Sequence, residues 1–211
     1  MTDLVCLVAD KNIEAALAGL LDRRRESLGL RRLVHEITVH QRRDPGCYHG
    51  GPEMLRGLLG AQRTRGLLVF DQAWKGNPHA SAAETEGAIR GRFQQLGISD
   101  RAEVVVLDPE IEAWVWSRSP HVDDVLGWRG ATPTLRRWLR ERDLWPEGHG
   151  KPADPKAAME RALYERRIPR SSSLYRQLAE RVSLTSCQDA AFDRLCQVLR
   201  TWFPAAEGGE A

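Results

Sequence analysis

Acidic residues follow three of the four segments that have the pattern of a buried strand. Asp10 comes after the apolar run 4–8, Asp71 after 66–70, and Asp108 after 104–107. In an open parallel sheet, ligands bind at the edge formed by the carboxyl ends of the strands. Carboxylates at that edge suit a hard divalent cation such as Mg²⁺, which takes oxygen ligands and keeps several waters. The pattern therefore predicts metal-assisted hydrolysis, in which the cation generates a nucleophilic water and stabilises phosphoryl oxygens.

More acids lie close to these in the sequence. Glu14 follows Asp10 by four residues, which places both on one face of a helix. Glu110 and Glu112 follow Asp108 in the segment Asp-Pro-Glu-Ile-Glu. The ordinary alternative is that Asp10 and Asp108 cap the helices after them, a role worth about 1 kcal/mol. The residues alone leave both interpretations open.

The elements that must position these acids alternate between strands and helices in the first half of the chain. Strand patterns at 4–8, 33–39, 66–70 and 104–107 are separated by helical spacing at 13–28, 52–62 and 82–96. Pro52 would occupy the first helical position after a glycine-rich loop at 46–51. Strands joined by helices imply right-handed crossovers, and so an α/β fold whose mainly parallel sheet is sandwiched by helices.

The second half of the chain has no convincing strand. Helical patterns recur at 110–116, 134–142, 155–166, 174–181 and 188–202. We therefore expect an α/β domain over residues 1–118, a helical C-terminal segment over 119–204, and a disordered polar tail over 205–211.

Composition narrows the possible partners. The chain of 211 residues has 31 Lys and Arg against 29 Asp and Glu, a net charge of +2, which excludes one large basic field. No apolar run approaches the roughly 20 residues of a membrane-spanning helix, and the first residues lack the pattern of a signal peptide. We expect a cytoplasmic protein without a membrane partner.

Positive charge is nevertheless concentrated beside aromatic residues in the second half. Arginine forks match phosphate oxygens and stack on aromatic rings, so these clusters suit a nucleic-acid backbone. A lysine in the polar loop after Asp71 could add a further phosphate contact. Interspersed acids such as Glu141 leave open a plain solvated surface. The candidate nucleic-acid-binding residues are Lys75, Arg136, Arg137, Arg140, Arg167 and Arg170.

Several segments together resemble the motifs of the Toprim (topoisomerase–primase) fold. Residues 7–17 (Leu-Val-Ala-Asp-Lys-Asn-Ile-Glu-Ala-Ala-Leu) resemble its strand-to-helix opening, and residues 68–73 (Leu-Val-Phe-Asp-Gln-Ala) its strand-end Asp-x-Asp motif. Residues 109–114 (Pro-Glu-Ile-Glu-Ala-Trp) are similar to the Glu-Phe-Glu-Ala signature of small Toprim-like proteins from bacterial anti-phage defence loci. Residues 178–184, with the apolar helix after them, resemble the tail of that group.

The resemblance implies a nuclease-like phosphodiesterase that uses Mg²⁺ or Mn²⁺ on DNA or RNA in bacterial anti-phage defence. Glu14, Asp71 and Glu112 would have catalytic roles. Lys75 would neutralise phosphate charge. The implied metal ligands are Asp10, Glu14, Asp71, Glu110 and Glu112.

Two departures from the family pattern support a second hypothesis. Ala9 stands where the family has its first-strand Glu, and Ala73 replaces the second acid of Asp-x-Asp. A chain with these changes could instead be a catalytically degenerate subunit that binds nucleic acid or a partner protein in a multi-component defence complex. A small-molecule enzyme on a Rossmann-like sheet is a weaker third hypothesis, since no dinucleotide fingerprint follows the first strand.

Overall fold

The fold is an α/β fold built on one four-stranded parallel sheet. The computed structural model describes residues 1–60, 63–184, 187 and 189–205. The strands are β1 (Leu4–Val8), β2 (His35–Val39), β3 (Arg65–Asp71) and β4 (Ala102–Leu107), in the order β2-β1-β3-β4. Leu4 is in register with both His35 and Arg65 on the neighbouring strands, so β1, β2 and β3 begin level with one another. The predicted fold class is confirmed.

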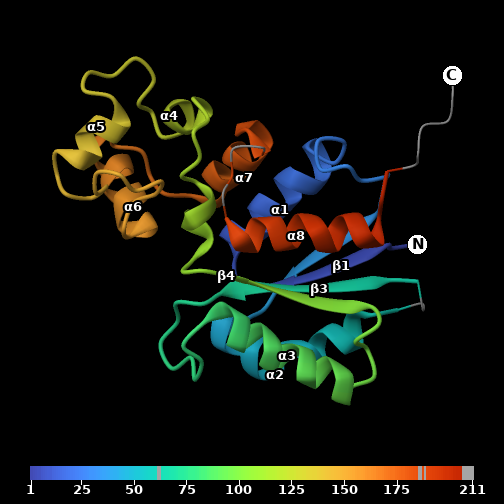
Figure 1. The fold of residues 1–211 in the computed structure, drawn as a ribbon. Coiled ribbons are helices and arrows are strands. Elements are labelled where there is room, and N and C mark those ends of the chain that lie inside the picture. The colour runs from blue at the N-terminus through green and yellow to red at the C-terminus, as the bar shows by residue number, and fades with distance from the viewer. Residues whose placement is uncertain (61–62, 185–186, 188, 206–211) are drawn as a thin grey trace, which may run out of the picture.

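Helices cover both faces of the sheet. Figure 1 shows α2 (Arg43–Leu58) and α3 (Ala82–Gln95) on one face, and α1 (Lys11–Arg23) with α8 (Ala190–Trp202) on the other. Helix α7 (Ser172–Arg181) packs along α1, while α8 packs against β4. Gly19 permits the close approach of α1 and α7, because a Cβ there would lie 2.9 Å from the carbonyl oxygen of Arg176.

A group of short helices lies beyond the carboxyl ends of the strands (Figure 1). It comprises the 3₁₀ turn η1 (Ile111–Trp114), α4 (His121–Val125), α5 (Leu135–Arg140) and α6 (Pro155–Glu165). Buried tryptophans form its core in two edge-to-face or tilted pairs, Trp116 with Trp145 and Trp128 with Trp138. The indole N–H groups of Trp116 and Trp128 donate to carbonyls of α6. These four of the seven tryptophans in the sequence thus supply a core for helices that are too short to be stable alone.

The main departure from the sequence prediction is α2. Residues 46–51, expected as a loop, are helical, and Pro52 lies inside the helix rather than at its first position. Proline has no N–H to donate to the carbonyl of Tyr48, and the Arg92 guanidinium of α3 donates to that carbonyl instead. Gly46 and Gly51 let α2 approach its neighbours, since a Cβ would lie 2.2 Å from His40 Nδ1 and 3.1 Å from Leu68 respectively. Gly46 and Gly51 are therefore explained by close packing, which leaves no room for a side chain at either position.

Smaller differences concern the second half of the chain. The helix predicted at 110–116 is only the short turn η1, and α4 was not anticipated. The hydrophobic core continues from β1 to α8, and the domain division near residue 118 stays a prediction. The predicted tail falls largely on 206–211, and the predicted helix limits at 62 and 188 also lie outside the described residues. None of the helices in the described ranges has the length and apolar character needed to cross a membrane.

The packing of α2 predicts opposite effects for two glycine substitutions. Gly46→Ala should destabilise the fold by about 1–3 kcal/mol, because the new methyl group collides with the His40 ring. Gly57→Ala, on an exposed part of the same helix with no atom near the added Cβ, should stabilise it by about 0.4–1 kcal/mol. Urea unfolding of both variants measures the difference, and equal effects would contradict this account of the glycines.

Candidate functional site: the strand-end carboxylates

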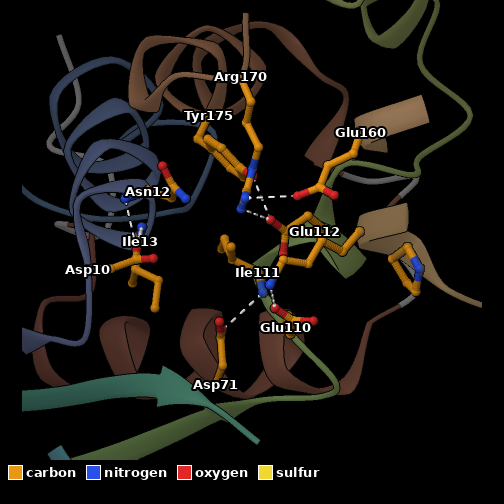
Figure 2. Close-up of polar contacts among 12 residues, drawn as sticks. Asp10, Asn12, Ile13, Asp71, Glu110, Ile111, Glu112, Glu160, Arg170 and Tyr175 are labelled. Atoms are coloured by element: carbon orange, nitrogen blue, oxygen red, sulfur yellow. Dashed lines mark hydrogen bonds and ion pairs between the residues drawn. The ribbon is translucent and has the colours of Figure 1, made fainter. Parts of the chain in front are cut away.

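Asp71 is the central acid of the candidate site. It is the last residue of β3, and it is 8% exposed. Its Oδ1 accepts a hydrogen bond from the backbone N–H of Ile111 at 3.0 Å, and its own N–H donates to Asp44 Oδ1 at 2.9 Å. Figure 2 shows Asp71 directed at the turn that follows β4. These bonds tie the end of β3 to the start of α2 and to η1.

The electrostatics of Asp71 show that several acids have been brought together. Burial raises the pKa of Asp71 well above its usual value, and the negative charges of Asp44, Glu112, Asp10 and Glu110 raise it further. Burial also raises the pKa of Asp44, with a contribution from the charge of Asp10. The carboxyl edge of the sheet therefore has an excess of negative charge around a buried carboxyl group.

Asp44 is a member of this cluster that the sequence analysis missed. It lies in the first turn of α2, directly after β2, so each strand is followed by an acid near the same edge. The sequence does have an acid soon after the strand predicted at 33–39. The prediction of a loop at 46–51 concealed the start of α2, and with it the position of Asp44. Asp44 and Asp10 thus both lie at the start of the helix that follows a strand, Asp10 as the N-cap of α1 and Asp44 inside the first turn of α2.

Glu112 is held by residues from the C-terminal half. It is 1% exposed, and its Oε1 accepts hydrogen bonds from the Tyr175 hydroxyl at 2.6 Å and from Arg170 Nη2. Arg170 also donates to the Tyr175 hydroxyl at 2.8 Å and to Glu160 at 3.1 Å (Figure 2). Within the described part of the chain, Glu112 Oε2 is buried and has no hydrogen-bond partner. Burial raises the pKa of Tyr175, and the charge of Glu112 adds to that shift.

The other predicted acids have different surroundings. Glu110 forms an ion pair with Lys156 of α6. Asp10 caps α1, since its Oδ1 accepts from the N–H groups of Asn12 at 2.8 Å and Ile13 at 3.0 Å. Glu14 pairs with Lys11 on its own helix at 2.7 Å. The capping interpretation is confirmed for Asp10, whose charge also acts on Asp71.

The capping interpretation is wrong for Asp108. This residue is exposed, and Glu110 occupies the N-cap position of the turn that follows β4. The cis peptide bond between Asp108 and Pro109 lies between the strand and that turn. Of the strand-end acids, Asp108 is thus the one that faces solvent, while Asp71 is buried.

The acids of the cluster do not form a closed metal-binding cage among the described residues. Among the residues that the structure describes, no group of three or more His, Cys, Asp or Glu side chains is arranged to hold a metal ion. Mg²⁺, however, commonly binds through one or two carboxylates and keeps several waters. Asp71 and Asp44, whose charges act on one another, and Glu112, whose Oε2 has no partner among the described residues, are the acids that could contact an ion bound in this way.

The predicted nucleic-acid-binding residues divide into two kinds. Arg136 and Arg170 are engaged: Arg136 donates to the Ser117 carbonyl at 2.9 Å and lies over the Trp145 ring, and Arg170 holds Glu112. Arg137 is exposed but pairs with Glu141 at 2.8 Å. The remaining three, all exposed, are Lys75, Arg140 and Arg167.

Lys75 lies in the loop that follows Asp71, and side chains of that loop brace it. Gln72 donates to the His79 carbonyl and Asn77 donates to the Gln72 carbonyl, so the loop is held by its own side chains. Trp74 packs against Tyr48, with 5.7 Å between ring centroids. These contacts hold the backbone of the loop that carries the exposed Lys75.

Comparison of the chain with protein-family models, curated proteins and solved structures finds no match. The fold and the site are thus defined by their own geometry. They describe an α/β protein with an acidic cluster at the carboxyl edge of a parallel sheet. This arrangement is compatible with a Toprim-like fold.

The raised pKa of Asp71 predicts how its replacement affects stability. A carboxyl group whose pKa is higher in the folded state favours folding below its unfolded pKa of about 3.9, and this advantage is lost as pH rises through the folded value. Asp71→Asn keeps the acceptor for Ile111 and removes the charge. The melting temperature should rise by at least about 2–4 °C at pH 8, and by less at pH 5. Thermal melts at both pH values test this, and a gain that is larger at pH 5 would contradict it.

The buried ion pair of Glu112 predicts a large cost for losing its partner. Arg170→Met should destabilise the protein by about 3–5 kcal/mol, because it leaves a buried carboxylate without its cation. Arg176→Met breaks exposed ion pairs to Asp22 and Glu180, and should cost only about 0.2–1 kcal/mol. Denaturant unfolding compares the two variants, and similar losses would show that the Glu112 pair is not buried in solution.

Proposed function

We propose that this protein is a metal-dependent, nuclease-like phosphodiesterase that acts on nucleic acid. The observation that carries the proposal is the crowding of carboxyl groups on the buried Asp71. Such crowding is unfavourable for folding alone, and strongly shifted groups of this kind cluster at functional sites. Carboxylate oxygens are also the ligands that Mg²⁺ and Mn²⁺ prefer.

The surroundings of each residue suggest its role in the proposed reaction. Asp71 and Asp44, with support from Asp10, would hold the cation, because their negative charges act on one another. Bound Mg²⁺ or Mn²⁺ would supply a nucleophilic water and stabilise phosphoryl oxygens. Glu112 has a carboxylate oxygen with no partner in the described ranges, and it would accept a proton. Lys75, exposed beside the end of β3, would contact phosphate.

The biological setting that we propose is bacterial anti-phage defence, in the cytoplasm. This part of the proposal rests on the resemblance of residues 7–17, 68–73 and 109–114 to Toprim-like defence proteins. DNA and RNA are both candidate substrates. Other defence proteins are candidate partners, and a search of co-purifying proteins from the native host would identify them.

A second function is favoured by the ion pairs at the site. Lys156 and Arg170 already neutralise Glu110 and Glu112, and Ala9 and Ala73 replace two acids of the family pattern. A subunit with these features could bind nucleic acid or a partner protein without cleaving anything. Metal binding separates this alternative from the enzyme.

The metal proposal predicts a specific stabilisation by Mn²⁺. At a concentration about 100 times its dissociation constant, a ligand of the folded state stabilises by about 2.7 kcal/mol, or roughly 5–10 °C here. Asp71→Asn and Asp44→Asn should abolish the shift. Asp108→Asn, at the exposed strand-end acid, should retain it. Thermal shift with Mn²⁺ and with Mg²⁺ measures this, alongside cleavage of labelled DNA and RNA.

Equal Mn²⁺ responses in the Asp71 and Asp108 variants would reject the site. A wild-type protein that shows neither stabilisation nor cleavage, but binds nucleic acid, would favour the non-catalytic subunit.

A further inference from the structure

One aromatic side chain of the helical segment lies in solvent. Tyr164 of α6 is 74% exposed, and it is the only exposed Phe, Trp or Tyr among the residues that the structure describes. The Arg161 guanidinium lies over its ring, 5.7 Å from the centroid. Tyr164 and Arg167 also line a shallow hollow at the end of α6, together with Ile168 and Pro169. Packing of the fold does not explain an aromatic ring in this position.

Two further arginines adjoin this hollow through tryptophan rings. The Arg142 guanidinium lies 4.1 Å from the centroid of Trp138, and the Arg166 guanidinium lies 4.9 Å from that of Trp128. The two rings form the tilted pair of the helical core. Each arginine also donates one hydrogen bond to a backbone carbonyl, Arg142 to Trp138 and Arg166 to Gly127. Both guanidinium groups are thus held in place, and each has five N–H donors of which one is used in this way.

Four exposed arginines here have no acid as an ion-pair partner in the described ranges: Arg142, Arg161, Arg166 and Arg167. Glu160, an acid on the same helix, pairs with Arg170 instead. Two exposed acids, Glu165 and Asp143, are sequence neighbours of these arginines and are fewer in number. The surface therefore has an excess of positive charge, and such a surface attracts phosphate groups.

Arg167 occupies a position that glycine would suit better. Its φ is 54°, directly after the last turn of α6. Its N–H donates to the Tyr164 carbonyl and that of Ile168 to the Leu163 carbonyl, both at 3.0 Å, which is the hydrogen-bond pattern of a Schellman motif. Glycine is usual at this place, because a Cβ is strained at positive φ. A strained, exposed arginine without an ion pair among the described residues indicates a function for its side chain.

We propose that Tyr164 and these four arginines, here called the arginine–tyrosine surface, bind single-stranded nucleic acid. A base stacks on the Tyr164 ring, and the arginines contact the phosphates of the strand. Guanidinium groups match phosphate oxygens, and stacking on an aromatic side chain requires a base that is free of its partner strand. The inference rests on the nucleic-acid partner of the proposed function, and it needs no metal ion.

The arginine–tyrosine surface leads toward the acidic edge of the sheet. Arg170, which binds Glu112, follows Arg167 by three residues, a span of at most about 10 Å of extended chain. Figure 1 shows α6 beyond the carboxyl ends of the strands. A strand bound on α6 therefore lies near the acids to which the proposed function assigns the chemistry.

Two substitutions of Tyr164 test the stacking contact. Fluorescence anisotropy of a labelled oligo-dT strand, measured in EDTA, reports the affinity without metal binding or cleavage. Tyr164→Ala should weaken binding by about tenfold, because it removes the ring on which a base stacks. Tyr164→Phe keeps the ring and should bind as wild type does. Neither change disturbs the core, since Tyr164 is exposed.

Arg167→Gly separates binding from folding. Near 0.1 M salt its affinity for oligo-dT should fall by about fivefold, and the dependence on log salt by about 0.7, the contribution of one phosphate contact on a single strand. Its melting temperature should rise by about 2–4 °C, because glycine relieves the strain at this φ. Arg56→Ala is the matched control: it removes an exposed arginine from α2, outside this surface, and should leave the affinity unchanged.

The outcomes separate this proposal from the metal site. If Tyr164→Ala binds oligo-dT as wild type does, or if Arg167→Gly loses no more affinity than Arg56→Ala, the arginine–tyrosine surface is overturned, whatever Mn²⁺ does to the melting temperature. A wild-type protein that binds no oligo-dT in EDTA overturns it as well. If the Tyr164 and Arg167 variants behave as expected while Mn²⁺ gives no stabilisation, the surface stands and the metal site falls.

Discussion

The structure depends on the convergence of carboxyl groups at one edge of a parallel sheet. All four strands run in one direction, so the acids that follow them are delivered to the same edge. Their mutual repulsion is opposed by hydrogen bonds that anchor Asp71 to Ile111 and to Asp44. Burial of Asp71 then prevents water from screening the charges around it. This unfavourable arrangement persists because the sheet and its helices are held by an extensive apolar core.

The C-terminal half is part of this balance. Tyr175 and Arg170 hold Glu112, and Lys156 holds Glu110. Helix α8 covers the sheet together with α1, and α7 packs along α1. The tryptophan pairs pack the short helices together, and Trp116 and Trp128 bond to α6, which carries Lys156. The helical C-terminal segment therefore supplies positive charges that offset part of the repulsion among the acids at this edge of the sheet. It also links any ligand of the acids to the packing of α6 and α7.

Much of the fold was predictable because its signals are local. The apolar runs of β1, β3 and β4 and the N-cap Asp10 mark elements that the structure contains. Helix α2 was mispredicted because glycine and proline ordinarily break helices, and here both are tolerated for long-range reasons. The Tyr48 carbonyl accepts a hydrogen bond from Arg92 of α3, and Gly51 makes room for Leu68 of β3. No local pattern contains either fact.

The sequence by itself determined the class of fold and the identity of most acids at the site, since strand order along the chain and residue type are enough to place Asp10 and Asp71 at one edge. Only the tertiary structure decided how each acid is used. It made Asp10 a helix cap, buried Asp71, added Asp44, and paired Glu110 and Glu112 with Lys156 and Arg170. The Asp10 cap is local, but the pairing of Glu110 and Glu112 depends on partners more than 40 residues away in the chain, and a carboxyl group takes its charge state from such surroundings.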